Sequence, residues 1–256
     1  MAKVVLDPGH GVETPGKRSF DGSLLEHEFN FDIAKRQKAV LERHGVEVVL
    51  TRLNEHDIPL AERVAIAKHY NADIFVSDHA DAYGSTWNSA NGYTVYTYTR
   101  IDAATTRLAQ CVDSAMSEVG SIRNRGIKQA DFYVLRNTPM PAILIEHGFY
   151  TNKVEGPKLK DTNVRQALAV AGAKGILQYF GIQYKGKEED TLKAVVTYAG
   201  DGDVFAAVLV AQKMHCPLMS VNDFKTSGIK AERVIQIGGK PGSDRFSSFK
   251  DAANLI

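Results

Sequence analysis

Short apolar runs of the length of buried strands alternate with longer segments of helical periodicity through the first 180 residues of the chain. Strands that are joined by helices pair in parallel, because the helix returns the chain to the same end of the sheet. The pattern therefore predicts an α/β fold, with a mostly parallel twisted sheet and helices on both faces. The expected strands cover residues 4–6, 46–51, 74–77, 92–98, 132–135 and 142–145, and the expected helices cover residues 28–44, 59–70, 105–119 and 164–180.

Composition limits the class of protein. Hydrophobic residues make up 44% and charged residues 24% of the 256 residues, which is typical of a globular protein with a sizeable core. The formal net charge is +1 without clustered lysine and arginine, so non-specific nucleic-acid binding is excluded. Two distant cysteines, Cys111 and Cys216, exclude a disulfide framework. Neither a signal-peptide pattern nor an apolar run of ~20 residues is found, and we expect a soluble cytoplasmic product.

A shift in composition divides the chain. Residues 182–190 are polar and rich in lysine and glutamate, which indicates a linker between a domain at 1–181 and a smaller one at 191–256. The smaller domain is expected to be α/β, and it is near the lower size limit for folding alone. We expect a partner copy or the first domain to support it. Its predicted strands cover residues 193–198, 217–221 and 233–237, and its predicted helices cover 204–213 and the segment from 246 onward.

Side chains with useful chemistry follow three of the expected strands. Asp7, Pro8 and Gly9 end the first strand, so that His10 is presented at its carboxyl end. His79 comes just after the third strand and Glu146 just after the last. Carboxyl ends of parallel strands share one edge of the sheet, where ligands bind, so these side chains are expected to converge.

Glu26 stands just ahead of the first long helix and can reach the same edge. Two neutral imidazoles and one carboxylate form a known catalytic zinc arrangement with an open position for water. A second carboxylate is then needed as general base, and we assign Glu146 to this role. Each residue also has an ordinary interpretation: His79 as a core histidine, Glu26 as a charge that the helix dipole favours, and Glu146 as a surface residue.

Other polar residues are interpreted as structural. Arg52 and Arg63 are expected to clamp loops together. Asp7 and Asp78 are candidates for orienting a ligating imidazole through its other nitrogen. The remaining histidines are expected to be solvated or structural, although His147 could contact substrate. They are His27, His44, His56, His69, His147 and His215.

Five blocks, in order, resemble the zinc-dependent N-acetylmuramoyl-L-alanine amidases of the type 3 group over residues 3–180. The first block reads Leu-Asp-Pro-Gly-His-Gly at residues 6–11, and the second is Glu26 followed by Asn30. The others are residues 51–52 with 60–63, residues 72–82, and residues 141–152. The sequence departs from the family at Asp78, where an apolar residue is usual, and at Asp81, where asparagine is usual.

The resemblance implies that His10, Glu26 and His79 bind Zn²⁺ and that Glu146 is the catalytic glutamate. The spacing to Asn30 favours Glu26 over Glu28 as the ligand. The implied reaction is hydrolysis of the amide between the lactyl group of N-acetylmuramic acid and the L-alanine of the stem peptide. A zinc peptidase or deacetylase on a similar scaffold, and a non-enzymatic wall-binding protein, are the competing hypotheses.

The second domain resembles one copy of a clostridial-type cell-wall-binding repeat, on residues 199–201, 216–218, 234–239 and 243–246. This resemblance implies peptidoglycan, and a secondary wall polymer, as binding partners. The combination favours a phage endolysin that a holin admits to the cell wall. A host autolysin or mother-cell lysis amidase is the alternative, and an oligomerisation domain is the alternative for residues 191–256.

Overall fold

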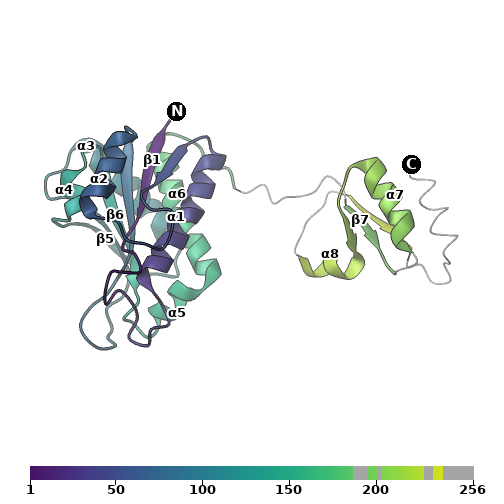
Figure 1. The fold of residues 1–256 in the computed structure, drawn as a ribbon, viewed down its shortest axis with the longest axis horizontal. Helices are drawn as coiled ribbons and strands as arrows, with labels where there is room; N and C mark the ends of the chain where they lie inside the picture. The colour runs from purple at the N-terminus through teal and green to yellow at the C-terminus, as the bar shows by residue number, and fades with distance from the viewer. Residues whose placement is uncertain (187–194, 201–202, 228–232, 239–256) are drawn as a thin grey trace. The chain divides into compact units, whose positions relative to one another are not determined.

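The computed structural model describes residues 1–186, 195–200, 203–227 and 233–238 (Figure 1). The chain divides into two compact units, one at Met1–Tyr184 and one at Lys185–Ile256. None of the described helices is long and apolar enough to cross a lipid bilayer. The two units are described separately below.

A six-stranded sheet with the strand order β2-β1-β3-β6-β4-β5 forms the centre of the first unit. Its neighbours pair in parallel, except that β4 runs antiparallel to β6. The predicted α/β class with a mostly parallel sheet is therefore confirmed. The strands are β1 (Lys3–Pro8), β2 (Glu47–Leu50), β3 (Ile74–Asp81), β4 (Tyr93–Thr97), β5 (Asn124–Gln129) and β6 (Ala142–Phe149).

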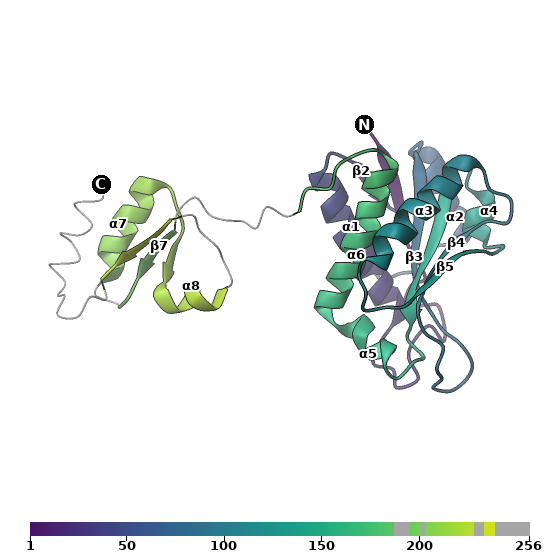
Figure 2. The ribbon, with the colours of Figure 1, turned by 180° about the vertical axis from the view of Figure 1, so that it is seen from behind.

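Helices cover both faces of this sheet (Figures 1 and 2). On one face, α1, α3 and α6 bury a large apolar core that includes Phe29, Leu108 and Ile176. On the other face, α2 and α4 bury a smaller core around Val64 and Leu135. The helices of this unit are α1 (Glu26–Arg43), α2 (Leu60–His69), α3 (Ala103–Ser117), α4 (Tyr133–Asn137), α5 (Glu155–Lys160) and α6 (Thr162–Tyr179).

Two predictions near the sheet edge were wrong. The segment expected as a strand at residues 132–135 begins the short helix α4, since a four-residue apolar run does not distinguish a strand from one helical turn. The strand β5 was not predicted, because its sequence Asn-Arg-Gly-Ile-Lys-Gln is polar and its outer edge is unpaired in the sheet. Gly126 adopts a left-handed φ of 76° there, and the pairing register with β4 shifts.

The elements that carry the candidate site also extend further than expected. β3 continues through His79 to Asp81, and β6 continues through Glu146 to Phe149. These two side chains therefore lie on the strands near their carboxyl ends and not behind them. Helix α1 begins at Glu26 itself, so this carboxylate lies in the first helical turn, where the helix dipole favours a negative charge.

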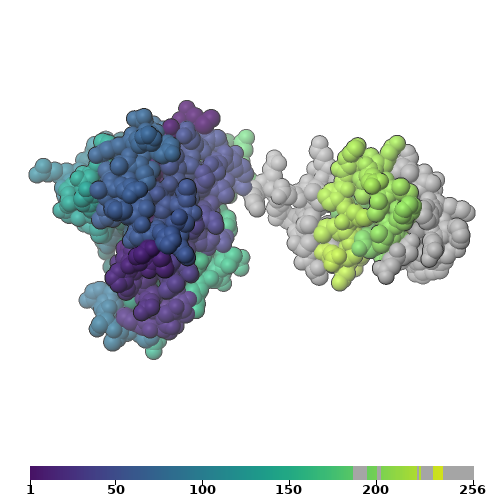
Figure 3. Space-filling model, in the orientation of Figure 1, coloured from purple at the N-terminus to yellow at the C-terminus, as the bar shows by residue number. Residues whose placement is uncertain are grey.

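The loop of residues 11–24 lies at the surface against the segment that follows β2 (Figure 3, purple beside blue). The backbone N–H of Val12 donates to the carbonyl of Glu55 at 2.8 Å, and the N–H of Asp57 donates to the Glu13 carboxylate at 2.8 Å. The loop is thus held against the fold, and it connects His10 to Glu26.

The second unit contains a three-stranded parallel sheet with the order β8-β7-β9. The elements β7 (Val195–Tyr198), α7 (Val204–Met214), β8 (Leu218–Ser220) and β9 (Val234–Ile237) match the expected segments closely, and α8 (Val221–Ser227) is added. Val196, Val210 and Ile235 belong to its small apolar core. The predicted helix from residue 246 onward lies outside the described residues.

Candidate active site

The turn after β1 directs His10 toward β3. His10 has a φ of 58°, in the left-handed region that residues other than glycine rarely adopt. The N–H of the preceding Gly9 donates to the carbonyl of Asp78 at 3.0 Å, which ties the turn to β3. A Cβ atom at Gly9 would overlap the ring of His79, so only glycine lets the turn approach this closely.

His10, Glu26 and His79 converge at the carboxyl edge of the sheet. The Glu26 Oε1 atom lies 3.3 Å from His10 Nε2 and 3.1 Å from His79 Nδ1. The two imidazole rings are perpendicular, with centroids 4.9 Å apart. Ligand atoms from the three side chains all lie within 4.8 Å of one another, and this is the one such cluster of three or more His, Cys, Asp or Glu residues within the described ranges.

Buried contacts hold the Glu26 carboxylate in place. The N–H of Ala80 donates to Oε1 at 3.3 Å, and the hydroxyl of Tyr150 donates to Oε2 at 3.3 Å. The amide of Asn30, one helical turn further along α1, donates to the carbonyl of Gly9 at 3.0 Å. Burial alone would raise the pKa of Glu26, but hydrogen bonds from His10 and His79 outweigh it and hold the pKa far below its usual value.

The protonation states suit a metal ion. Burial lowers the pKa of the His10 imidazole, despite the opposing effect of the Glu26 carboxylate, and so favours the neutral form that binds metals. Two neutral nitrogens and one anionic oxygen are a donor set that zinc prefers. The three side chains therefore fit the predicted metal site in residue type and in mutual distance.

Glu146 lies beside this cluster on the neighbouring strand, because β3 and β6 pair with His79 opposite Glu146. Its Oε2 atom is buried and has no hydrogen-bond partner in the described part of the chain. Burial raises the pKa of this carboxyl well above its usual value, and the negative charges of Glu26 and Asp81 raise it further, whereas Lys17 opposes them. Such a carboxylate is a strong proton acceptor for its residue type.

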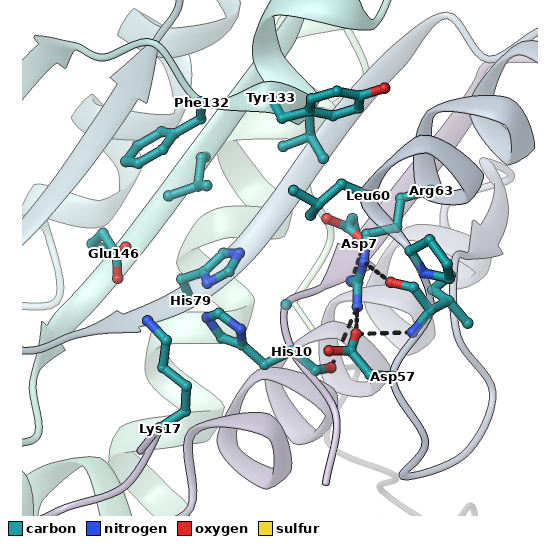
Figure 4. Close-up of a pocket in the computed structure, with 15 residues that line it drawn as sticks. Asp7, His10, Lys17, Asp57, Leu60, Arg63, His79, Phe132, Tyr133 and Glu146 are labelled. Atoms are coloured by element: carbon teal, nitrogen blue, oxygen red, sulfur yellow. Dashed lines mark hydrogen bonds and ion pairs between the residues drawn. The ribbon is translucent and has the colours of Figure 1, made fainter. Parts of the chain in front are cut away.

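A cavity of about 400 Å³ opens over these groups (Figure 4). Its polar part contains His10, Lys17, His79 and Glu146, and its opposite wall is mainly apolar. The sequence did not assign Lys17 or this wall to the site, because these residues come from separate segments that only the fold brings together. The wall residues are Ile58, Pro59, Leu60, Phe132, Tyr133, Val134 and Leu144.

The expected arginine clamps are present. Arg63 is 1% exposed and pairs with Asp7 at 2.7 Å and with Asp57 at 2.6 Å. Arg52 donates to the carbonyl of His27 at 2.6 Å and to that of Pro8 at 3.3 Å. Both guanidinium groups thus fasten the turn after β1 to the segments around it.

The proposed imidazole-orienting role of Asp7 and Asp78 was wrong. Asp7 accepts hydrogen bonds from Thr51, Arg63 and Ser77 at 2.5 to 2.7 Å. Both aspartates are buried, and neither bonds a candidate ligand among the described hydrogen bonds.

Asp78 instead pairs with His147. Its Oδ1 atom lies 2.8 Å from His147 Nε2 and accepts the amide of Gln37 at 3.0 Å. Asp78 and His147 are fully buried on the face of the sheet that α1 covers, so His147 is structural and does not line the cavity.

Residues 4–178 match a family model described as N-acetylmuramoyl-L-alanine amidase. The amidase LytC of Bacillus subtilis is 38% identical over 178 residues, which are 69% of this chain and 35% of LytC. A sporulation-specific amidase of the same organism is 33% identical over 185 residues, which are 72% of this chain and 70% of that protein. The chain thus spans about a third of the first relative and more than two thirds of the second.

Solved structures of similar fold cover the same region. The catalytic domain of CwlV from Bacillus (Paenibacillus) polymyxa superposes with a TM-score of 0.67 at 32% identity, over 72% of this chain and 100% of that domain. AmiC2 of Nostoc punctiforme superposes with a TM-score of 0.65 at 39% identity, over 70% of this chain and 97% of that structure. Both are N-acetylmuramoyl-L-alanine amidases by description, and both matches are of the size of the first unit.

Proposed function

Because the chain belongs to the N-acetylmuramoyl-L-alanine amidase family of enzymes, we propose that its first unit is a zinc-dependent peptidoglycan hydrolase. Its reaction is cleavage of the amide between the lactyl group of N-acetylmuramic acid and the L-alanine of the stem peptide. The observation that carries this proposal is the convergence of His10, Glu26 and His79 in one cavity with Glu146 on the adjacent strand.

His10, Glu26 and His79 would hold the zinc ion. When bound, zinc supplies a Lewis acid that polarises an amide carbonyl and increases the acidity of water. The Glu146 carboxylate accepts a proton from the attacking water and passes it to the leaving alanine nitrogen. Burial and nearby negative charges increase its affinity for that proton, which suits a group that must hold it between the two steps.

The products of digestion test this reaction. The full chain is incubated with purified peptidoglycan, and new alanine amines, reducing sugar ends and released acetate are measured. An amidase releases alanine amines alone. A zinc peptidase liberates other amino termini, and a deacetylase liberates acetate, so either result would contradict the proposal. Wall binding without any product would favour the non-catalytic alternative.

We propose a wall-binding role for residues 191–256, on the basis of their resemblance to clostridial-type repeats. Loss of wall retention in a chain that ends at residue 184 would support this role. If the full chain and the shortened chain are retained equally, and the full chain sediments as a dimer but the shortened chain as a monomer, the result would favour oligomerisation. The retention assay is repeated on walls that have been stripped of the secondary wall polymer. Loss of retention on these walls identifies the polymer as the binding partner.

A phage endolysin is the setting we propose, in which the enzyme accumulates in the cytoplasm and reaches the wall through a holin. The similarity to a sporulation-specific amidase of Bacillus subtilis favours a host enzyme for mother-cell lysis as the second candidate. Expression with and without a holin separates the two. Lysis only with the holin supports the endolysin, and lysis without it supports the host enzyme.

A further inference from the structure

Lys17 introduces a positive charge into the polar part of the cavity. It lies in the loop between β1 and α1, and its half-buried side chain extends toward His10 and Glu146 (Figure 4). Its own carbonyl accepts the N–H of Glu26 at 2.9 Å, which fixes the Lys17 backbone next to the candidate metal site. The position of this ammonium group is therefore set by the fold of the site.

The ammonium group has no partner in the described part of the chain. Lys17 occurs in none of the side-chain hydrogen bonds or ion pairs there, although Asp81 and Glu146 are near enough to interact with it through their charges. A partly buried ammonium loses some hydration, and a bound anion restores this loss through charge-assisted hydrogen bonds. The lysine is thus available to a ligand.

The other cation of the cavity is already engaged, because Arg63 pairs with Asp7 and Asp57. The His10 and His79 rings face Glu26. The wall opposite Lys17 is mainly apolar. Among the described lining residues, an anionic group of the substrate therefore has one uncommitted cation to bind, and it lies on the loop side of the metal site.

The substrate carries a matching anion close to the scissile amide. The second residue of a stem peptide is a D-glutamate linked through its side-chain carboxyl, so its α-carboxylate is free unless it is amidated. This carboxylate is the first charged group on the alanine side of the scissile bond. The N-acetylated sugars on the other side are neutral.

We propose that Lys17 binds the free α-carboxylate of the second stem-peptide residue and makes the enzyme discriminate against its amide. This inference rests on the proposed amidase function. The contact between Lys17 and the carboxylate orients the substrate. The peptide lies toward the loop of residues 11–24, and the sugar lies toward the apolar wall. A half-exposed charge-assisted hydrogen bond is worth about tenfold in specificity.

Two soluble muramoyl tripeptides test this site. They differ only at the second residue of the peptide, whose α-carboxyl is free in one substrate and amidated in the other. Alanine release by the zinc-loaded full chain is measured for the wild type and for Lys17→Met, Lys17→Arg and Arg18→Met. Arg18 is the matched control, because it is exposed in the same loop and does not line the cavity. Zinc content is measured for every variant.

The wild type is expected to prefer the free acid by about tenfold in kcat/KM, mainly through KM. Lys17→Met is expected to lose this preference, so that its kcat/KM falls about tenfold more on the free acid than on the amidated substrate. Lys17→Arg is expected to retain most of the preference, and Arg18→Met to behave as wild type. Equal rates of the wild type on both substrates would overturn the inference and leave the amidase function intact.

An equal fall in kcat/KM on both substrates in Lys17→Met would also overturn the inference, since that result means that Lys17 acts on Glu146 or on the metal site. Failure of the wild type to cleave either substrate would refute the proposed function, and this inference with it.

Discussion

Replacement of Glu146 by glutamine separates catalysis from metal binding and from stability. The substitution keeps the size of the side chain and removes its ability to accept a proton. No hydrogen bond is broken at Oε2, which has no partner within the described residues, and the three candidate ligands are untouched. We therefore expect the zinc content, and the thermal unfolding of the zinc-loaded protein, to be close to those of the wild type.

The catalytic rate of Glu146→Gln should fall steeply. Loss of a general base commonly costs about 10²- to 10⁴-fold, which corresponds to roughly 3 to 5 kcal/mol in the activation free energy. The assay is alanine release from a soluble muramoyl peptide, with zinc measured in the same preparation. A variant that contains zinc and turns over within a few-fold of the wild type would refute the role of Glu146.

Three further predictions follow from the contacts around the site. Gly9→Ala should displace the His79 ring, lower the free energy of unfolding by about 1–3 kcal/mol and weaken zinc binding. Denaturation and zinc-competition experiments measure these effects. Gly186→Ala is the control, because its Cβ atom meets open space, and it should change neither stability nor zinc affinity. His147→Leu should leave Asp78 as an unpaired buried charge and cost about 3–5 kcal/mol in urea unfolding, and a smaller cost in the Asp78→Leu/His147→Leu double variant would confirm that the pair is the cause. In metal-free protein, the raised pKa of Glu146 contributes stability that is fully present below pH 4.5 and is lost as the pH rises through the folded-state pKa. Glu146→Gln should therefore gain stability relative to the wild type over that pH range. A difference in melting temperature that does not depend on pH would contradict this prediction.

The sheet and the helices that bury its faces were predictable, because long apolar segments with clear periodicity dominate them. Helix α6 and strands β1 and β3 are examples, and they contribute Ile176, Val5 and Phe75 to the two cores. The errors fall where local sequence and tertiary context disagree. β5 is polar and is the edge strand of the described sheet, and α4 is a single helical turn that begins with Tyr133 and Val134, residue types that favour strands.

The candidate site was partly accessible for a different reason. His10, His79 and Glu146 follow apolar runs, and parallel pairing brings such positions to one edge. Nothing in that pattern reveals which side of a strand a residue faces. Asp78 and His147 adjoin His79 and Glu146 in sequence, yet they point to the opposite face and pair under α1. The alternation of side chains along β3 and β6 accounts for this difference.

Lys17 and the apolar wall of the cavity were out of reach of sequence reasoning. Lys17 is a single lysine in a surface loop, and its place in the lining of the cavity distinguishes it from its exposed neighbour Arg18. The wall combines the segment before α2 with the start of α4, two regions more than 70 residues apart in the chain. Contacts of this kind depend on the packing of helices on the sheet.

Titration of zinc into the chelated enzyme tests the central claim most directly. The metal is removed from the full chain, zinc is returned in known equivalents, and alanine release from peptidoglycan is followed together with bound zinc. Activity that is lost on chelation and restored in proportion to zinc, up to one equivalent per chain, is the predicted result. Full activity in the chelated enzyme, or zinc binding that persists unchanged in a His10→Ala/His79→Ala variant, would contradict the account.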